Sequence, residues 1–254
     1  MQLYNALQIS PDVPELICLV GGGGKTTAMF RLASELKALG RRVLVTTTTS
    51  IIVPDEDQCD RCIQLETQDA AELSSSAPGS ILCLGGGLTD NGLKFRSVAP
   101  GVVDLLFREK RFDYILVEAD GARRKPIKAP AGHEPVLPSR TTLTVGVIGL
   151  DALGTAISDD TVHRPELFCS LTGKALGERI EAADIIALTH APEGLFKGVP
   201  DGCRQQVLLN KAENEARRSA ARTIAAALRG PGSRPAPGVI IASLARSRTY
   251  AAAE

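Results

Sequence analysis

Residues 20–27 read Val-Gly-Gly-Gly-Gly-Lys-Thr-Thr and directly follow the short apolar run Leu16–Leu19. Apolar side chains then recur at helical spacing over residues 28–39, and Gly40 stands where a helix would end. A buried strand, a glycine turn and a helix, in that order, predict a phosphate-binding loop. Glycines allow main-chain N–H groups to converge on phosphate oxygens, and the helix N-terminus adds about half a positive charge.

The side chains that follow the glycines predict a nucleotide with its Mg²⁺. Lys25 is expected to reach the terminal phosphates, and the Thr26 hydroxyl is expected to bind Mg²⁺. The alternative is a glycine turn that only closes a corner between strand and helix, which would not require Lys-Thr-Thr. The predicted nucleotide-binding residues of the loop are Gly21, Gly22, Gly23, Gly24, Lys25, Thr26 and Thr27.

The loop departs from the commonest form of this motif, which has glycine at the position of Leu19. Gly21–Thr27, read as Gly-Gly-x-Gly-Lys-Thr-Thr, resembles the P-loop of MinD-like and signal-recognition-type NTPases. Many of those NTPases carry a second lysine before the first glycine, where this chain has Val20. The resemblance therefore implies an NTPase that must take positive charge for phosphoryl transfer from another part of the chain.

The chain has 254 residues, with 29 Lys and Arg residues and 29 Asp and Glu residues. Its length suits one sizeable α/β core, with or without a small lobe, and a single domain over residues 1–254 is predicted. The zero net charge gives no reason to expect nucleic acid or an anionic membrane as the partner. No stretch approaches the roughly 18 apolar residues of a membrane-spanning helix, so we expect a soluble, cytoplasmic protein.

Short apolar runs recur along the chain, with helical stretches such as residues 102–110 and 213–228 between them. Most runs are continuously apolar, which is typical of strands buried on both faces. The pattern predicts an α/β fold with an open, mostly parallel, doubly wound sheet of the P-loop NTPase type. Ligands of such sheets bind beyond the carboxyl ends of the strands. The predicted strands are Leu16–Val20, Arg42–Thr47, Ile81–Leu84, Tyr114–Glu118, Leu143–Ile148, Ile185–Thr189, Gln206–Asn210 and Val239–Ser243.

The strand at residues 114–118 ends in two carboxylates and a glycine, Glu118-Ala119-Asp120-Gly121. NTPases of the resembled type place an acid at the end of a neighbouring strand, usually as Asp-x-x-Gly, to hold the Mg²⁺ shell. Glu118 takes the first place of that pattern, and Asp120 is the alternative because Glu is one methylene longer. A pair of solvated acids is the non-functional interpretation. The predicted metal ligands are Thr26, Glu118 and Asp120.

A basic segment, Ala122-Arg123-Arg124-Lys125-Pro126-Ile127-Lys128, follows directly. Cations just beyond the predicted metal ligands suit a polyphosphate or an anionic substrate, although a solvated basic loop has the same composition. The segment belongs to a predicted loop over residues 119–141, and a loop of this length is typically functional or disordered. Two further segments, His133-Glu134 and His163-Arg164-Pro165-Glu166, either line a substrate site or are ordinary surface loops.

A third motif, Asn210-Lys211-Ala212-Glu213, ends a predicted strand late in the chain. The related Asn-Lys-x-Asp motif reads guanine in many GTPases: the amide meets the base edge, the lysine stem lies along the ring and the Asp accepts from guanine N–H groups. Glu213 replaces that Asp, so the choice between ATP and GTP stays open. Asn210, Lys211 and Glu213 are the predicted base-binding residues.

Cys59 and Cys62 form a lone Cys-x-x-Cys pair. A zinc site would need two more ligands, and no nearby residues form an obvious second pair. Cys18 and Cys83 lie in predicted buried strands, so they are interpreted as small core residues, and no disulfide framework is expected.

The middle of the chain carries a specific set of motifs: Glu118–Ala122, Lys128–Pro130, His133–Pro138, Gly149–Gly154 and Val162–Glu166. Together with the glycine loop and Asn210-Lys211, they resemble the selenium-dependent hydroxylase accessory proteins of the YqeC type. The resemblance covers most of the chain. It implies a P-loop protein that assists maturation of selenium-dependent molybdenum hydroxylases, with such a hydroxylase or its cofactor as the partner.

The combined prediction is a Mg²⁺-dependent nucleoside triphosphate-binding protein that hydrolyses ATP or GTP. One alternative is a small-molecule kinase or an ATP-dependent ligase, in which the basic loop binds an acceptor. The other is a nucleotide-gated carrier or adaptor that barely turns over. The residues expected to take part in catalysis are Lys25, Glu118, Asp120, Arg123 and Lys128.

Overall fold

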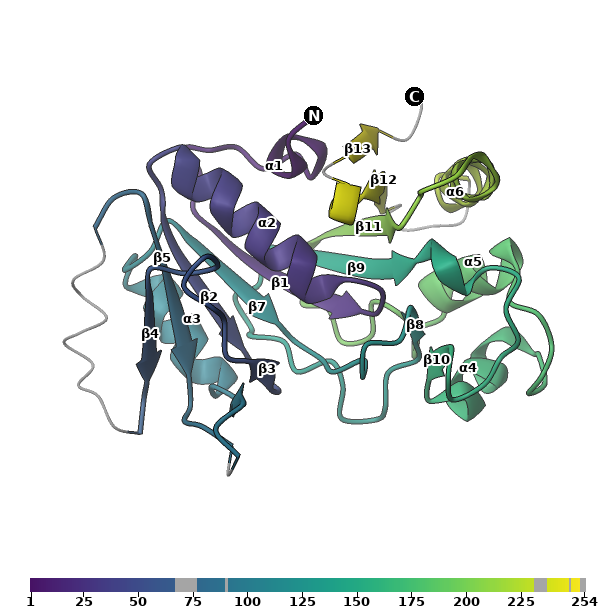
Figure 1. Cartoon of the computed structure of the whole chain (residues 1–254), viewed down its shortest axis with the longest axis horizontal. Helices are drawn as coiled ribbons and strands as arrows, with labels where there is room; N and C mark the ends of the chain where they lie inside the picture. Colours follow the sequence, from purple (N-terminus) through teal and green to yellow (C-terminus); the bar gives the residue numbers. More distant parts are fainter. Residues whose placement is uncertain (67–76, 90, 231–236, 247, 252–254) are drawn as a thin grey trace.

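The computed structural model describes residues 1–66, 77–89, 91–230, 237–246 and 248–251. Its main feature is a nine-stranded sheet in the order β13-β12-β11-β9-β1-β7-β2-β5-β4 (Figure 1). Adjacent strands are parallel except at the edge, where β13 pairs with β12 in the antiparallel sense. The predicted α/β fold with a mostly parallel sheet is therefore confirmed. The strands are β1 (Glu15–Gly21), β2 (Arg42–Thr47), β4 (Arg61–Gln64), β5 (Ser80–Gly85), β7 (Tyr114–Glu118), β9 (Leu143–Gly149), β11 (Arg204–Asn210), β12 (Gly238–Ser243) and β13 (Arg248–Ala251).

Helices cover both faces of the sheet. Successive side chains of each central strand point to opposite faces, so the strands contribute to two apolar cores, and each core is covered by helices. In β1, Leu16 and Cys18 enter one core, whereas Ile17 and Leu19 enter the other. The second core also contains residues of α1 (Leu3–Ala6) and α2 (Lys25–Ala38), and Figure 1 shows α2 lying across the sheet. The first core contains residues of α3 (Pro100–Arg108), α4 (Pro165–Thr172), α5 (Ala182–His190) and α6 (Glu215–Leu228).

Seven of the eight predicted strands form near their expected bounds, but the prediction for Ile185–Thr189 is wrong. That segment lies in α5, whose buried residues include Ile185 and Leu188 at helical spacing. A capping box starts the helix: the main-chain N–H of Glu181 donates to the Asp184 carboxylate at 2.8 Å. A short apolar run fits a buried strand and a buried helix equally well, and here the cap favours the helix.

Two small sheets lie outside the main one. β3 (Ile51–Ile52) pairs with β6 (Lys94–Phe95), and β8 (Ile127–Lys128) pairs with β10 (Val162–His163). The second pair joins the predicted 119–141 loop to the segment that precedes α4. Within the described residues, no helix combines the length and apolar character needed to cross a membrane.

Candidate nucleotide-binding site

The glycine loop connects β1 to α2 in backbone conformations that other residues rarely adopt. Gly23 and Gly24 have φ angles of +81° and +127°. A Cβ on Gly23 would lie 2.2 Å from the main-chain nitrogen of Gly149, and a Cβ on Gly24 would lie 2.5 Å from the side-chain nitrogen of Asn210. The loop therefore requires glycine at these positions, because the ends of β9 and β11 pack directly against its backbone.

The main-chain N–H groups of the loop divide into two sets. Those of Gly22 and Gly23 donate to the main-chain oxygens of Val147 (2.8 Å) and Lys125 (2.9 Å). Those of residues 24–27 have no acceptor within the described part of the chain. These last groups are the open donors at the start of α2, where the helix dipole also favours an anion. Anion binding by the backbone is therefore expected at the start of the helix, beyond the first glycines.

Lys25 is buried, and its ammonium group is held within the protein. Its Nζ donates to the main-chain oxygen of Gly21 at 2.7 Å. The same Nζ lies 3.1 Å from Asp120 Oδ1 and 3.8 Å from Glu118 Oε1. The lysine thus neutralises both acids at the end of β7, and a bound phosphate would compete with them for the same charge.

Glu118 lies at the carboxyl end of β7 and faces the first turn of α2. Its Oε2 accepts a hydrogen bond of 2.7 Å from the Thr26 hydroxyl. The main-chain oxygen of Glu118 accepts from Thr47 Oγ1 at 2.9 Å, which fixes the strand end against β2. Burial raises the pKa of Glu118, and the neighbouring Lys25 and Thr26 offset part of that effect.

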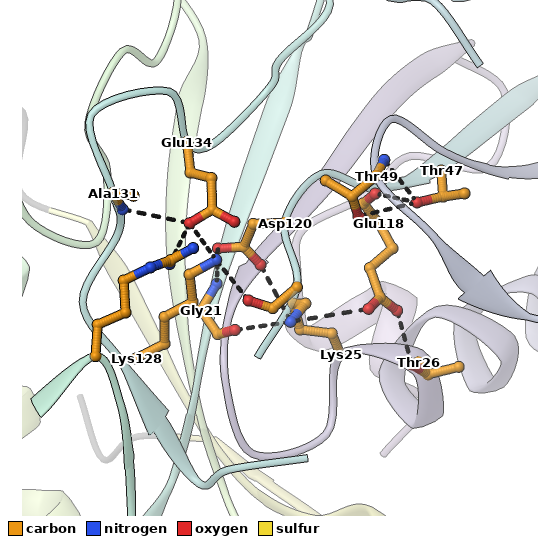
Figure 2. Close-up of polar contacts among 12 residues, drawn as sticks. Gly21, Lys25, Thr26, Thr47, Thr49, Glu118, Asp120, Lys128, Ala131 and Glu134 are labelled. Carbon is orange, nitrogen blue, oxygen red and sulfur yellow. Dashed lines mark hydrogen bonds and ion pairs between the residues drawn. The ribbon is translucent and has the colours of Figure 1, made fainter. Parts of the chain in front are cut away.

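Two carboxylates and a hydroxyl therefore meet next to the glycine loop (Figure 2). Asp120 Oδ2 accepts from the main-chain N–H of Gly21 at 3.0 Å, whereas its buried Oδ1 has no hydrogen bond and only the ionic contact with Lys25. Oxygen donors of this kind fit Mg²⁺, which keeps several waters and binds through one or two carboxylates plus phosphate. Among the described residues, no group of three His, Cys, Asp or Glu side chains has the geometry of a metal site.

Lys128 lies behind the loop, in a chain of buried charges. Its Nζ is 3.1 Å from Asp120 Oδ2 and 2.9 Å from Glu134 Oε2, and it donates to the main-chain oxygen of Gly121 at 2.6 Å. Glu134 also accepts from Arg164. Burial acts to raise the pKa of Glu134, but the hydrogen bonds from Arg164 and Lys128 lower it to about 2. Lys128 thus faces acids in the protein interior, although the sequence predicted a residue that contacts substrate.

A cavity of about 870 Å³ opens over the start of α2. Of the predicted site residues, it brings together the second half of the glycine loop, Glu118, Arg123 and Lys211. Four other predicted site residues lie behind the residues that line the cavity: Gly21, Gly22, Asp120 and Lys128. The lining residues are Gly23, Gly24, Lys25, Thr26, Thr27, Ser50, Ile51, Ile52, Lys94, Glu118, Gly121, Ala122, Arg123, Arg124, Lys125 and Lys211.

The predicted base-binding residues occupy different surroundings. The Asn210 amide nitrogen donates to the main-chain oxygen of Gly23 at 2.9 Å, and its oxygen accepts from the Leu244 N–H at 3.1 Å. Asn210 therefore ties the glycine loop to the end of β12. Lys211 lines the cavity, with its Nζ 2.7 Å from Asp151 Oδ2.

Glu213 is absent from the lining of the cavity in the described part of the chain. Its carboxylate lies 3.7 Å from the guanidinium group of Arg217, one turn further on in α6. To accept from a base held beside Lys211, this side chain would have to leave Arg217.

Several residues around the cavity had no signal in the sequence. Asp151, which accepts from Lys211, lies in the segment Gly149–Gly154, and no local pattern marks it as the partner of a lysine 60 residues further along the chain. Ile51, Ile52 and Lys94 reach the cavity through the two-residue strands β3 and β6, which are too short to show a periodic pattern. Their pairing across the chain is a tertiary feature.

Cys62 lies in β4, at the edge of the sheet beside β5, and Cys59 lies just before that strand. Their Sγ atoms are 3.4 Å apart, and both cysteines are free thiols. No third and fourth ligand complete a zinc site within the described residues. These thiols are therefore not part of the candidate site.

The parallel doubly wound sheet, with a glycine loop between β1 and α2 and an acid at the end of β7, defines an α/β protein of the P-loop NTPase-like class. A family model described as YqeC protein matches residues 17–166, so the chain belongs to the YqeC family. It is similar to a protein of Escherichia coli (strain K12) named uncharacterized protein YqeC, with 37% identity over 201 residues. That similarity covers 78% of this chain and 76% of the Escherichia coli protein.

Proposed function

We propose that this protein binds a nucleoside triphosphate with Mg²⁺ in the cavity over α2 and hydrolyses it. One observation carries the proposal. The open N–H groups of residues 24–27, the Lys25 ammonium and the Thr26–Glu118 pair line the same cavity, each next to where a phosphate chain would lie. A glycine turn that only closes a corner would not require a buried lysine with two acids beside it.

Some residues of the site would bind the phosphates, and others would hold the metal ion. The N–H groups of residues 24–27 and Lys25 would bind the phosphate oxygens. Thr26 and Glu118 would hold Mg²⁺ or its waters, and Asp120 Oδ1, now in ionic contact with Lys25, would join the same shell once a phosphate takes that lysine. The metal would supply charge neutralisation of the phosphates. Arg123, exposed on the cavity wall, is the cation that would reach the transferring phosphoryl group.

Nucleotide binding would rearrange the charges that now surround Lys25. A phosphate that pairs with the Lys25 ammonium would weaken the ion pairs of Lys25 with Asp120 and Glu118. Mg²⁺ bound at these two carboxylates would then balance their negative charge. Triphosphate and metal are therefore expected to bind with positive cooperativity.

Family membership is the basis for the biological setting. The chain belongs to the YqeC family, and the motifs that resemble the selenium-dependent hydroxylase accessory proteins support the setting that we propose. In that setting the protein assists the maturation of selenium-dependent molybdenum hydroxylases, with the hydroxylase or its cofactor as the client. A second function, phosphoryl transfer to a small acceptor, is favoured by the separate cavity beside Arg123.

The test is phosphate release from ATP and GTP with and without Mg²⁺, combined with calorimetry of nucleotide binding. We expect binding that requires Lys25 and slow release that requires Mg²⁺. Addition of a candidate hydroxylase or its cofactor should accelerate release if the protein acts on such a client. Calorimetry that shows no nucleotide binding to the folded protein would contradict the proposal.

A further inference from the structure

A second cavity, of about 360 Å³, adjoins the one over α2. Gly121 and Arg123 line both cavities, so the two cavities meet at Arg123, the residue that we propose reaches the transferring phosphoryl group. The remaining lining residues are Glu134, Asp159, His163, Arg164 and Glu166. None of these residues has a role in the nucleotide-binding scheme described above.

The pairing of β8 with β10 builds this cavity from two parts of the chain. His163 pairs with Lys128, and the main-chain oxygen of His163 accepts from the Ala129 N–H at 3.2 Å. Arg164, the N-cap residue directly before α4, has a left-handed conformation with φ of +66°. Such a conformation is uncommon for residues other than glycine and is found mainly where surrounding structure or function enforces it.

The floor of the cavity is already neutralised. The buried Glu134 carboxylate accepts from both Lys128 and Arg164, so it places no uncompensated charge in the cavity. Burial and the positive charges of Arg164 and Lys128 lower the pKa of His163 to about 4, so its imidazole is neutral at physiological pH. His163 can therefore donate or accept one hydrogen bond to a ligand without carrying charge.

The walls of the cavity carry charges of opposite sign. Arg123 makes no ion pair within the described part of the chain, and its guanidinium group has all its donors available. Asp159 and Glu166 are exposed, and their carboxylates likewise have no cationic partner among the described residues. A ligand that matches this arrangement has an oxyanion at one end and a hydrogen-bond donor, such as an ammonium or hydroxyl group, at the other.

We infer that this second cavity binds a small molecule of that kind beside the nucleotide. Arg123 binds its phosphate or carboxylate group, and Asp159 and Glu166 accept from its donor end. The inference rests on the proposed function, because it assigns a co-ligand to the nucleotide. It gives the chain a binding site that simple hydrolysis of a triphosphate does not need.

The imidazole signals of the protein offer a direct measurement, because the chain has 3 histidines. The signal of His163 is followed by NMR during titration with one of three small molecules: phosphoethanolamine, the free amino acid glycine, or inorganic phosphate. His190, at the end of α5, serves as the internal control. Each titration is run on the nucleotide-free protein and on protein saturated with a non-hydrolysable triphosphate and Mg²⁺, so that phosphate binding at the glycine loop is separated from binding at this cavity.

We expect a saturable shift of the His163 signal, and no shift of the His190 signal, with phosphoethanolamine or glycine. The arm that saturates at lower concentration identifies the oxyanion as phosphate or carboxylate. Arg123→Ala should weaken this binding about tenfold or more, since it removes a charge-assisted contact. Arg124→Ala is the matched control, because Arg124 is also exposed but lines only the first cavity.

Asp159→Asn tests whether the cavity recognises the hydrogen-bond donor of the ligand, because the substitution should change the affinities of two probes in opposite directions. It should weaken phosphoethanolamine binding but strengthen that of inorganic phosphate, which has only the oxyanion. The inference is overturned if the His163 signal fails to saturate with every probe, or if Arg123→Ala and Arg124→Ala behave alike. Calorimetry on the same samples separates the two ideas: absence of triphosphate binding with an intact His163 titration would reject the proposed function and keep the second site.

Discussion

Lys25 Nζ lies 3.1 Å from Asp120 Oδ1, with both side chains buried, and this oxygen has no hydrogen bond to any described residue. The lysine that would bind phosphate is therefore also the counter-ion of a buried acid. Lys25→Ala should remove a phosphate contact of about 1.5–3 kcal/mol, a loss of roughly tenfold to hundredfold in nucleotide affinity. It should also lower the free energy of unfolding by about 3 kcal/mol, because Asp120 loses one of its two cations.

The double variant Lys25→Ala/Asp120→Asn separates these effects. Neutralising Asp120 should recover much of the lost stability in urea unfolding, whereas nucleotide affinity measured by calorimetry should stay low. A folded Lys25→Ala protein with unchanged affinity would exclude the glycine loop as the phosphate site.

Glu118→Gln is expected to weaken Mg²⁺-dependent activity more than Asp120→Asn does. Glu118 lines the cavity and accepts from Thr26, whereas Asp120 stands behind the wall and holds the Gly21 N–H. Both substitutions keep shape and remove charge. Mg²⁺ titrations of nucleotide hydrolysis provide the comparison, and the reverse ranking would make Asp120 the main metal ligand.

Guanine nucleotides should bind at least as tightly as adenine nucleotides if Glu213 reads the base. Because this carboxylate now lies 3.7 Å from Arg217, Arg217→Ala should free it and raise the preference for GTP, whereas Glu213→Ala should abolish the preference. Competition binding of ATP and GTP measures both. An ATP preference that neither substitution alters would show that Glu213 has no contact with the base.

His163 should make the fold sensitive to mild acid. Its pKa is about 4 in the folded protein, below the ordinary value of 6.5, so the unfolded chain binds a proton in this range that the folded chain does not. Stability should therefore fall as the pH drops from about 6.5 to about 4. Urea unfolding of His163→Gln should show a smaller loss over that interval than the parent. Equal pH dependence in both proteins would assign the loss to other groups.

Hydrolysis is expected to be slow and to depend on Arg123. Many NTPases of the resembled type have a lysine at the position of Val20, and in a dimer that lysine contacts the nucleotide phosphates of the second subunit. Valine has no donor for such a contact, so the positive charge must come from another residue. Arg123→Ala should reduce the rate at saturating nucleotide, and Arg124→Ala should have a smaller effect. Light scattering should show no dimer that forms only with triphosphate. A triphosphate-dependent dimer, or equal rates in the parent and in Arg123→Ala, would contradict this prediction.

Local patterns in the sequence determined the elements that carry the phosphate site. The run Leu16–Leu19, the glycines and the periodic residues of α2 are contiguous, so propensity and spacing alone place a strand, a turn and a helix. The acid at the end of β7 was also visible, because an apolar strand that ends in Glu-x-Asp-Gly is a local signal. The same reasoning failed for Ile185–Thr189, where five residues are too few to distinguish a period of two from one of 3.6.

Only the tertiary structure decided which partners the charged residues take. Lys128 had the composition of a substrate-binding cation, yet the folded chain places it between Asp120 and Glu134. The motif around Asn210 predicted a residue that contacts the base, yet its side chain is hydrogen-bonded to Gly23 and Leu244, which are distant in sequence. These outcomes depend on strand order and on the β8–β10 pairing, and such long-range contacts form because buried charges and amides must find partners. No pattern along the chain specifies them.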